Sequence, residues 1–197
     1  MVDRRMVSRW VVPDLTAVRA AHARLLAVID GLTDAAARRP SLLPGWTVGH
    51  VLTHVARNAD SFIWLAEGAA AGEVRDQYPG GFEQRQAEIE AGARRPAAEL
   101  VDDVRATGER LEADFDGVTD WEAPVRTMLG EVPLRELLFR RVREVEIHTS
   151  DLDLEHTWED WSEAFVDAQL DRLGPAGRRH VVAFLAGRAD VPPRIFG

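Results

Sequence analysis

The stretch GWTVGHVLTHVARNAD, from Gly45 to Asp60, carries the helical pattern that decides the fold. Thr47 is a favourable N-cap, and the apolar residues that follow it recur with the period of an α-helix. We expect this helix to reach about Gly68. Its apolar stripe consists of Val48, Val51, Leu52, Val55, Ala59, Phe62 and Ile63. Such a stripe predicts a long amphipathic helix with one face in a core.

The two histidines of this stretch fall on different faces of the expected helix. At about 100° per residue, His54 lies at the edge of the apolar stripe, near Val51 and Asn58. His50 lies on the polar side with Arg57, where we expect it to be mostly exposed. The alternative for His54 is a boundary histidine with a structural hydrogen bond. A zincin protease motif is excluded, because Val51 stands where that motif requires glutamate.

Helical periodicity extends from this stretch over most of the chain. A first helix is expected over Pro13–Gly31, and a weaker one begins near Phe82. A stronger helix spans about residues 96–117, and the last spans Pro133–Asp151, with the proline as its first residue. No strand-like alternation exceeds a few residues. The sequence therefore predicts a mainly α fold, a four-helix bundle over about residues 10–152.

The chain is expected to have two parts. Residues 1–156 form the bundle domain, and residues 157–197 form a short C-terminal segment that packs on it. A helix is expected to begin near Ser162, and another covers the run HVVAFLAGR after the GPAG break. This segment is too small for a core of its own.

Composition narrows the classes of function. The net charge of -9 argues against a nucleic-acid partner. No apolar stretch is long enough to span a membrane, and the N-terminus lacks a signal-peptide core, so we expect a cytoplasmic protein. Cysteine is absent, which excludes disulfides and a protein-borne thiolate. A sulfur nucleophile would have to arrive on a small molecule.

The last bundle helix supplies residues that complement His54. His148 lies on the margin of its apolar stripe, and Glu144 lies one turn earlier on the same flank. Glu146 points elsewhere and is expected to be solvated. A helix-stabilising pair is the alternative for Glu144 and His148. Together with His54, they would offer two imidazoles and one carboxylate to zinc or another divalent metal, with positions left open.

Two further residues of this helix are candidates for the site. Helical phase places Arg141 within the apolar stripe, where it either snorkels to the surface or holds a carboxylate of a substrate or cofactor near the metal. Asp151 lies one turn after His148. It either accepts the free N–H of that imidazole or is a polar residue at the helix end.

The segments SLLPGWTVGHVLTHVARNAD and RRVREVEIHTSDL resemble the metal-binding segments of the DinB-like superfamily of four-helix bundles. More narrowly, the chain resembles the mycothiol-dependent maleylpyruvate isomerase family over about three quarters of its length. The resemblance implies that His54, Glu144 and His148 are zinc ligands. It also implies a functional role for Arg188, which ends the FLAGR stretch before a VPPRIFG tail. The alternative for Arg188 is a surface arginine in a terminal helix. The segment between Trp158 and His180 is shorter than the family's C-terminal sheet would need.

The function implied is a zinc- and thiol-dependent isomerase. A metal-bound thiolate of mycothiol would add reversibly to the activated double bond of maleylpyruvate, so that cis becomes trans. Arg141 and Arg188 would hold carboxylates and stabilise developing charge, with Arg141 and Asn58 binding substrate or thiol. One alternative is a mycothiol S-transferase acting on an electrophile. Another is a non-catalytic metal-binding bundle. We expect a monomer or homodimer.

Overall fold

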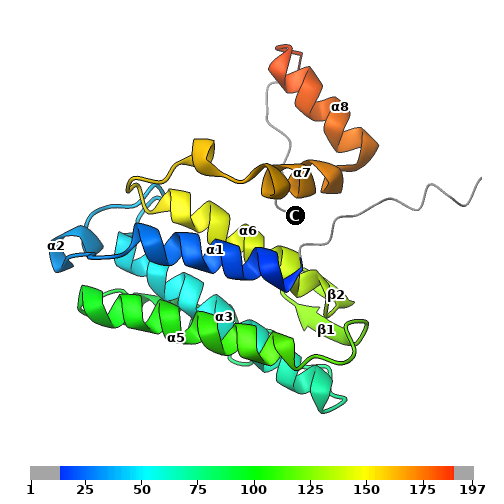
Figure 1. The fold of residues 1–197 in the computed structure, drawn as a ribbon, viewed down its shortest axis with the longest axis horizontal. Helices are drawn as coiled ribbons and strands as arrows, with labels where there is room; N and C mark the ends of the chain where they lie inside the picture. Colours follow the sequence, from blue (N-terminus) through cyan, green and yellow to red (C-terminus); the bar gives the residue numbers. More distant parts are fainter. Residues whose placement is uncertain (1–13, 189–197) are drawn as a thin grey trace, which may run out of the picture. The chain divides into compact units, whose positions relative to one another are not determined.

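The computed structural model describes residues 14–188, so the N-terminal residues 1–13 and the tail VPPRIFG lie outside the described residues. The described chain divides into two compact units, one through Asp160 and one from Trp161 onward. Four long helices, which run side by side in Figure 1, make up the first unit. They are α1 (Leu15–Val28), α3 (Val48–Ala70), α5 (Ala97–Asp116) and α6 (Glu136–Asp151). The predicted mainly α four-helix bundle is confirmed.

The core of this unit lies between the four long helices, and α3 contributes more buried apolar residues to it than any other helix of the described chain. All seven residues of its predicted apolar stripe are buried, each at most 2 % exposed. Four of them, Val48, Val51, Leu52 and Val55, share one apolar cluster with residues of α1, α5 and α6, among them Leu25, Leu100 and Val145. Burial of this stripe fixes the rotation of α3 and hence the direction of every other side chain on the helix.

His50 takes part in the N-terminal cap of α3, a role that the sequence pattern did not predict. The backbone N–H of Thr47 donates to Nδ1 of His50 at 3.1 Å, which is one half of a capping box. Nε2 of the same ring lies 3.0 Å from a carboxylate oxygen of Glu90. His50 is therefore half-buried in a structural role rather than freely exposed.

Two shorter helices and a hairpin complete the first unit. The helices are α2 (Asp34–Ala37) and α4 (Gly81–Gly92), followed by a 3₁₀ turn at Trp158–Asp160 near the unit's end. The antiparallel strands β1 (Pro124–Thr127) and β2 (Gly130–Pro133) were not predicted.

Pro133 is the last residue of β2, so the prediction that it opens the following helix was wrong. It pairs with Pro124, and the next residue, Leu134, donates its backbone N–H to Ala123 at 2.9 Å. The chain is thus tied into the hairpin until Arg135, and α6 begins at Glu136.

The second unit contains α7 (Glu163–Arg172) and α8 (Gly174–Leu185). Ser162 caps α7 as expected, since its hydroxyl accepts a hydrogen bond from the backbone N–H of Phe165. No strand occurs between Trp161 and Arg188. That the segment after residue 156 packs on the bundle stays a prediction. Over the stretch 14–188, no helix combines the length and hydropathy needed to cross a membrane.

Candidate metal centre

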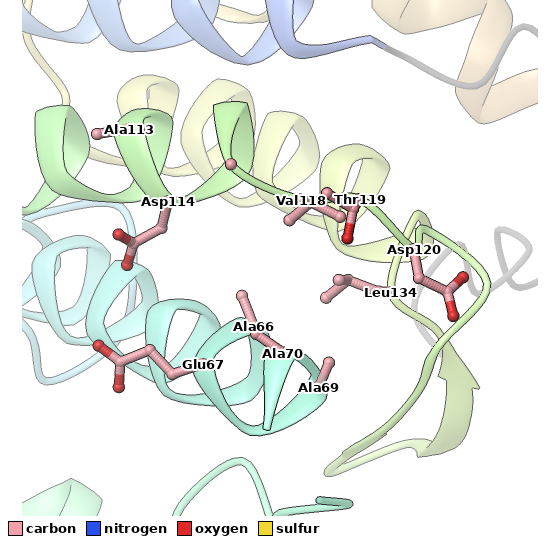
Figure 2. A pocket seen from close by; sticks show the side chains of 11 residues that line it. Ala66, Glu67, Ala69, Ala70, Ala113, Asp114, Val118, Thr119, Asp120 and Leu134 are labelled. Atoms are coloured by element: carbon pink, nitrogen blue, oxygen red, sulfur yellow. The ribbon is translucent and has the colours of Figure 1, made fainter. Parts of the chain in front are cut away.

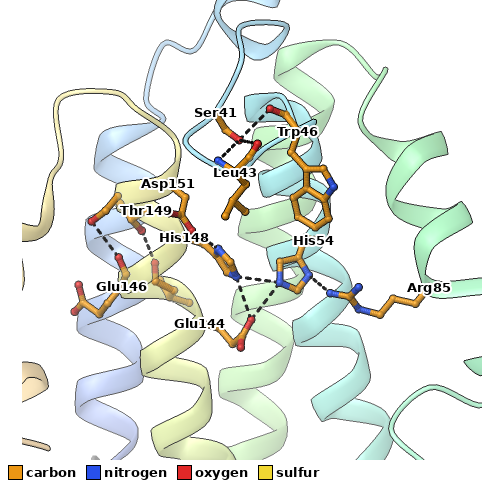
Figure 3. A network of polar contacts seen from close by, with 12 residues as sticks. Ser41, Leu43, Trp46, His54, Arg85, Glu144, Glu146, His148, Thr149 and Asp151 are labelled. Atoms are coloured by element: carbon orange, nitrogen blue, oxygen red, sulfur yellow. Dashed lines mark hydrogen bonds and ion pairs between the residues drawn. The ribbon is translucent and has the colours of Figure 1, made fainter. Parts of the chain in front are cut away.

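Three side chains from two helices meet on one side of the bundle, as Figure 3 shows. Nε2 of His54, on α3, lies 3.1 Å from Nε2 of His148 and 3.2 Å from Oε2 of Glu144, both on α6. The remaining distance, from Nε2 of His148 to Oε2 of Glu144, is 3.4 Å. Within the described residues, this is the one group of such side chains close enough to share a metal ion.

These distances fit the geometry of a zinc site. Donor atoms that each lie about 2.05 Å from a zinc ion at tetrahedral angles are about 3.3 Å from one another. The three measured separations, 3.1, 3.2 and 3.4 Å, bracket this value. Two imidazoles and one carboxylate are also the donor set of catalytic zinc sites that keep a fourth position open. The residues present therefore fit a divalent ion.

Neighbouring side chains hold the two imidazoles in place. Nδ1 of His148 lies 2.8 Å from a carboxylate oxygen of Asp151, which leaves Nε2 directed at the cluster. Such carboxylate–histidine pairs orient metal-binding imidazoles and increase their basicity. The ring of His54 packs edge-on against Trp46, with ring centroids 5.6 Å apart. In the metal-free cluster its Nδ1 lies 2.9 Å from Arg85 of α4. This contact has to open when Nε2 binds an ion, because Nδ1 of the neutral ring then carries the hydrogen and arginine can only donate.

Burial and mutual contact separate the pKa values of the three groups. Burial lowers the pKa of His54 to about 4. Burial also acts to lower the pKa of His148, but hydrogen bonds to Asp151 and Glu144 outweigh it and raise the pKa to about 9. Burial would raise the pKa of Glu144, yet its hydrogen bonds to both histidines hold it well below the usual range. At neutral pH the metal-free cluster thus consists of a neutral His54, an ionised Glu144 and a cationic His148, so the one proton that a metal ion must displace is on His148.

Metal binding is expected to release this proton and to depend on pH accordingly. An ion needs the neutral imidazole of His148, so protonation competes with it at every pH below about 9. The apparent affinity for zinc should rise about tenfold per pH unit between pH 6 and 8. Competition with a chromogenic chelator at pH 6, 7 and 8 measures this slope. A flat profile would show that no ligand carries a proton in the metal-free protein.

A cavity of about 260 Å³ opens beside the cluster. The three candidate ligands and Asn58 lie in its wall, together with arginines from two helices. Arg85 comes from α4, and Arg140 and Arg143 come from α6. The tip of the hairpin, Met128 and Leu129, and the ring of Tyr78 supply apolar wall. The wall thus combines an open metal position with positive charge, an arrangement suited to an anionic substrate.

The other predicted site residues occupy different places. Asp151 contacts His148 as expected, and Asn58 reaches the cavity. Arg141 does not line the cavity. It is completely buried behind Asn58 and so does not snorkel. Arg188 is exposed after α8 in the second unit, and its catalytic role stays a prediction.

Sequence reasoning missed two residues around the site and misplaced a third. His22 contacts Arg141, and its signal was a histidine four residues after Val18 within the apolar stripe of α1. Arg85 carries no such signal, because α4 has no apolar periodicity to orient it. Glu146 is 1 % exposed and pairs with Arg24 of α1, so the prediction that it is solvated was wrong. The carboxylate is buried because α1 packs directly on α6.

A second cavity, of about 390 Å³, lies where the C-terminal ends of α3 and α5 approach Leu134 (Figure 2). Alanines form much of its wall, and its ionisable side chains are the carboxylates Glu67, Asp114 and Asp120. Its lining includes no histidine and no arginine. The carboxylate of Glu67 is paired with Arg110, 3.0 Å away. We therefore place the candidate site at the cavity of about 260 Å³ beside the metal cluster.

Comparison with known proteins supports the fold described above. The mycothiol maleylpyruvate isomerase N-terminal domain family matches residues 18–153. A crystal structure of the mycothiol-dependent maleylpyruvate isomerase is 30% identical, with a TM-score of 0.76, over 81% of this chain and 67% of that chain. A structure of a histidine-to-alanine mutant of such an isomerase is 28% identical, with a TM-score of 0.76, over 85% and 70%. No curated protein matches the chain.

The family match covers well over half of the chain and spans the four long helices almost completely. The resemblance found in the two histidine-bearing segments is confirmed, and the bundle is consistent with the DinB-like fold. The chain belongs to the mycothiol maleylpyruvate isomerase family of enzymes.

Proposed function

We propose that His54, Glu144 and His148 bind zinc, and that the chain isomerises maleylpyruvate with mycothiol as its cosubstrate. The observation that carries this proposal is the set of three donor atoms, 3.1 to 3.4 Å apart, in the wall of an arginine-lined cavity. The mycothiol-dependent maleylpyruvate isomerase to which the chain is similar supplies the substrate class.

The chemistry needs a thiolate that this cysteine-free chain does not possess. When bound, zinc would lower the pKa of a coordinated thiol and so supply the thiolate at neutral pH. The sulfur adds to the double bond conjugated with the substrate carbonyl, and the electron pair moves onto the carbonyl oxygen. The carbon–carbon bond is then single and rotates, and return of the electron pair expels the same thiolate.

The protein side chains hold the substrate during this sequence. Arg85, Arg140 and Arg143 give the cavity wall a positive charge that suits the two carboxylates of maleylpyruvate. Asp151 keeps Nδ1 of His148 hydrogen-bonded, so that Nε2 stays directed at the ion. The thiol releases its proton to solvent when it binds as the thiolate. The isomerisation itself then needs no proton transfer by a protein group, because the thiolate that adds is the thiolate that leaves.

The test is a paired assay of product and thiol. Purified zinc-loaded protein is expected to convert maleylpyruvate to fumarylpyruvate while the concentration of free mycothiol stays constant. Stoichiometric loss of thiol with formation of an adduct would instead identify an S-transferase. Full isomerase activity in protein stripped of metal would contradict the proposal that the three ligands serve catalysis.

A further inference from the structure

The interior of the bundle contains a buried arginine, Arg141, that has no role in the isomerisation steps proposed above. Arg141 is 0 % exposed and is the largest fully buried side chain of the described chain. Its Nε donates to Nε2 of His22, and its Nη1 donates to the backbone oxygen of Val55 and to Oδ1 of Asn58, each at 2.9 Å. All of these acceptors are neutral groups, although burying an unpaired guanidinium is costly.

The protonation states of Arg141 and His22 fix which of the two donates each hydrogen bond. Burial lowers the pKa of Arg141 to about 10, so the guanidinium is still charged at neutral pH. Burial, followed by the nearby charge of Arg141, lowers the pKa of His22 to about 2, so this ring is neutral. An arginine can only donate, so Nε2 of His22 accepts and Nδ1 carries the proton. Nδ1 then donates to Glu112, 2.6 Å away, which holds the ring in place.

The same constraint fixes the carboxamide of Asn58. Because Arg141 donates to Oδ1, the other end of the carboxamide is the NH₂ group, with two hydrogens to donate. No side chain or backbone oxygen of the described chain accepts from Nδ2 of Asn58. The residue lines the cavity, one helical turn after His54 on α3. A charged donor on Oδ1 also polarises the amide and strengthens its N–H donors.

We propose that Asn58 is a catalytic residue that donates hydrogen bonds to the substrate oxygen on which negative charge develops, and that Arg141 is the residue that positions it. This inference rests on the proposed function and deepens it. When the thiolate adds to the double bond, the electron pair reaches the carbonyl oxygen, and the N–H groups of Asn58 meet that charge. Arg141 acts through Asn58 and does not itself contact substrate. A fixed donor costs no reorganisation when the charge appears.

The kinetic test uses Asn58→Ala, Arg141→Lys and the double variant. Loss of a single oxyanion donor lowers kcat by about 10²- to 10³-fold, and we expect this range for Asn58→Ala. KM should change by less than about threefold, because the bond strengthens mainly in the transition state. Arg141→Lys should lower kcat in the wild-type background and cause no further loss in the Asn58→Ala background. Equal losses by Arg141→Lys in both backgrounds would overturn the positioning role.

A second variant keeps the inference testable if alanine disturbs the fold. Asn58→Asp has the same shape and still accepts from Arg141, but it has no donor at neutral pH. It should retain one zinc per chain and lose kcat at least as severely. An Asn58→Asp protein with wild-type kcat would overturn the role inferred for Asn58 and would leave the proposed isomerase function intact. A wild-type protein that does not isomerise maleylpyruvate would overturn the proposed function and this use of Asn58 with it.

Contact between Asn58 and a ligand can be measured without an activity assay, because Asn58 is the chain's single asparagine. Selective ¹⁵N-asparagine labelling of the zinc-loaded full chain gives one side-chain NH₂ signal pair. We expect this pair to shift when the product, fumarylpyruvate, is added. Signals that stay in place while the product is shown to bind by calorimetry would contradict contact between Asn58 and the ligand.

Discussion

Replacing His54 by alanine is expected to abolish zinc binding and isomerase activity together. Only Glu144 and His148 would remain as protein donors, one fewer than catalytic zinc sites use. Without the ion, the cosubstrate thiol keeps an ordinary pKa of about 8.5 and is only about 3 % ionised at pH 7, which alone slows addition by roughly 30-fold. The thiol is also no longer held beside the substrate, which slows addition further. Metal content by plasma mass spectrometry and turnover of maleylpyruvate are measured on the same preparation.

His50→Ala is the matched control, on the same helix and one turn earlier. His50 accepts a hydrogen bond from Thr47 and contacts Glu90, outside the metal cluster. Its loss should cost no more than about 1 kcal/mol of stability through the weakened cap, with zinc content and kcat unchanged. If His54→Ala retained a full equivalent of zinc, or if His50→Ala lost it, the ligand assignment would be wrong.

Asp151→Asn is expected to weaken zinc binding about 10- to 100-fold, the usual cost of removing a carboxylate that supports a metal-binding histidine. The amide is a poorer acceptor for the Nδ1 proton of His148, so Nε2 becomes less basic. The change also lowers the pKa of His148, because the hydrogen bond that Nδ1 of this ring donates to the Asp151 carboxylate raises it. Affinity is therefore compared at pH 9, where the proton competes little in either protein.

Asp153→Asn provides the control for this substitution. Asp153 is exposed and has a positive φ of 53°, which asparagine also tolerates. The change removes the same charge two residues away without touching His148. Zinc affinity equal to wild type is expected for Asp153→Asn. Equal losses in the two variants would mean that Asp151 acts only through the field of its charge.

The sequence was sufficient to select the three candidate ligands, and the reason is helical phase. An apolar stripe fixes the rotation of a helix, so the burial of Leu52 and Val55 determines that His54 faces inward and His50 does not. The spacing between Glu144 and His148 places both on one flank of α6. That the two helices meet in register depends on tertiary packing, which phase alone does not encode.

Other parts of the fold lacked a signal that the sequence could provide. The strands of the hairpin have four residues each, and the Met128–Leu129 tip has none of the Asn-Gly or Asp-Gly pairs that mark tight hairpins. A proline near the start of a helical run is usually its first residue, and for this reason Pro133 was misassigned. Glu146 was misplaced because a buried ion pair depends on Arg24 from a distant helix.

For Arg141, the sequence indicates the direction of the side chain but not its partners. Its phase within the apolar stripe correctly predicts an inward-facing side chain, and the structure places it at 0 % exposure. The sequence could not indicate that its partners are His22, from α1, and Asn58, from α3. These contacts join residues that are 119 and 83 positions apart, and only the packed bundle brings them together.

Zinc-edge X-ray absorption fine structure of the purified wild-type protein measures the proposed ligand set itself. We expect one zinc per chain, with two imidazole nitrogens and one carboxylate oxygen about 2.0 to 2.2 Å from the metal. A sulfur contribution at about 2.3 Å should appear when mycothiol is added and at no other time, since the chain has no cysteine. A spectrum without imidazole scattering, or protein that binds no zinc, would show that His54, Glu144 and His148 do not form a zinc site.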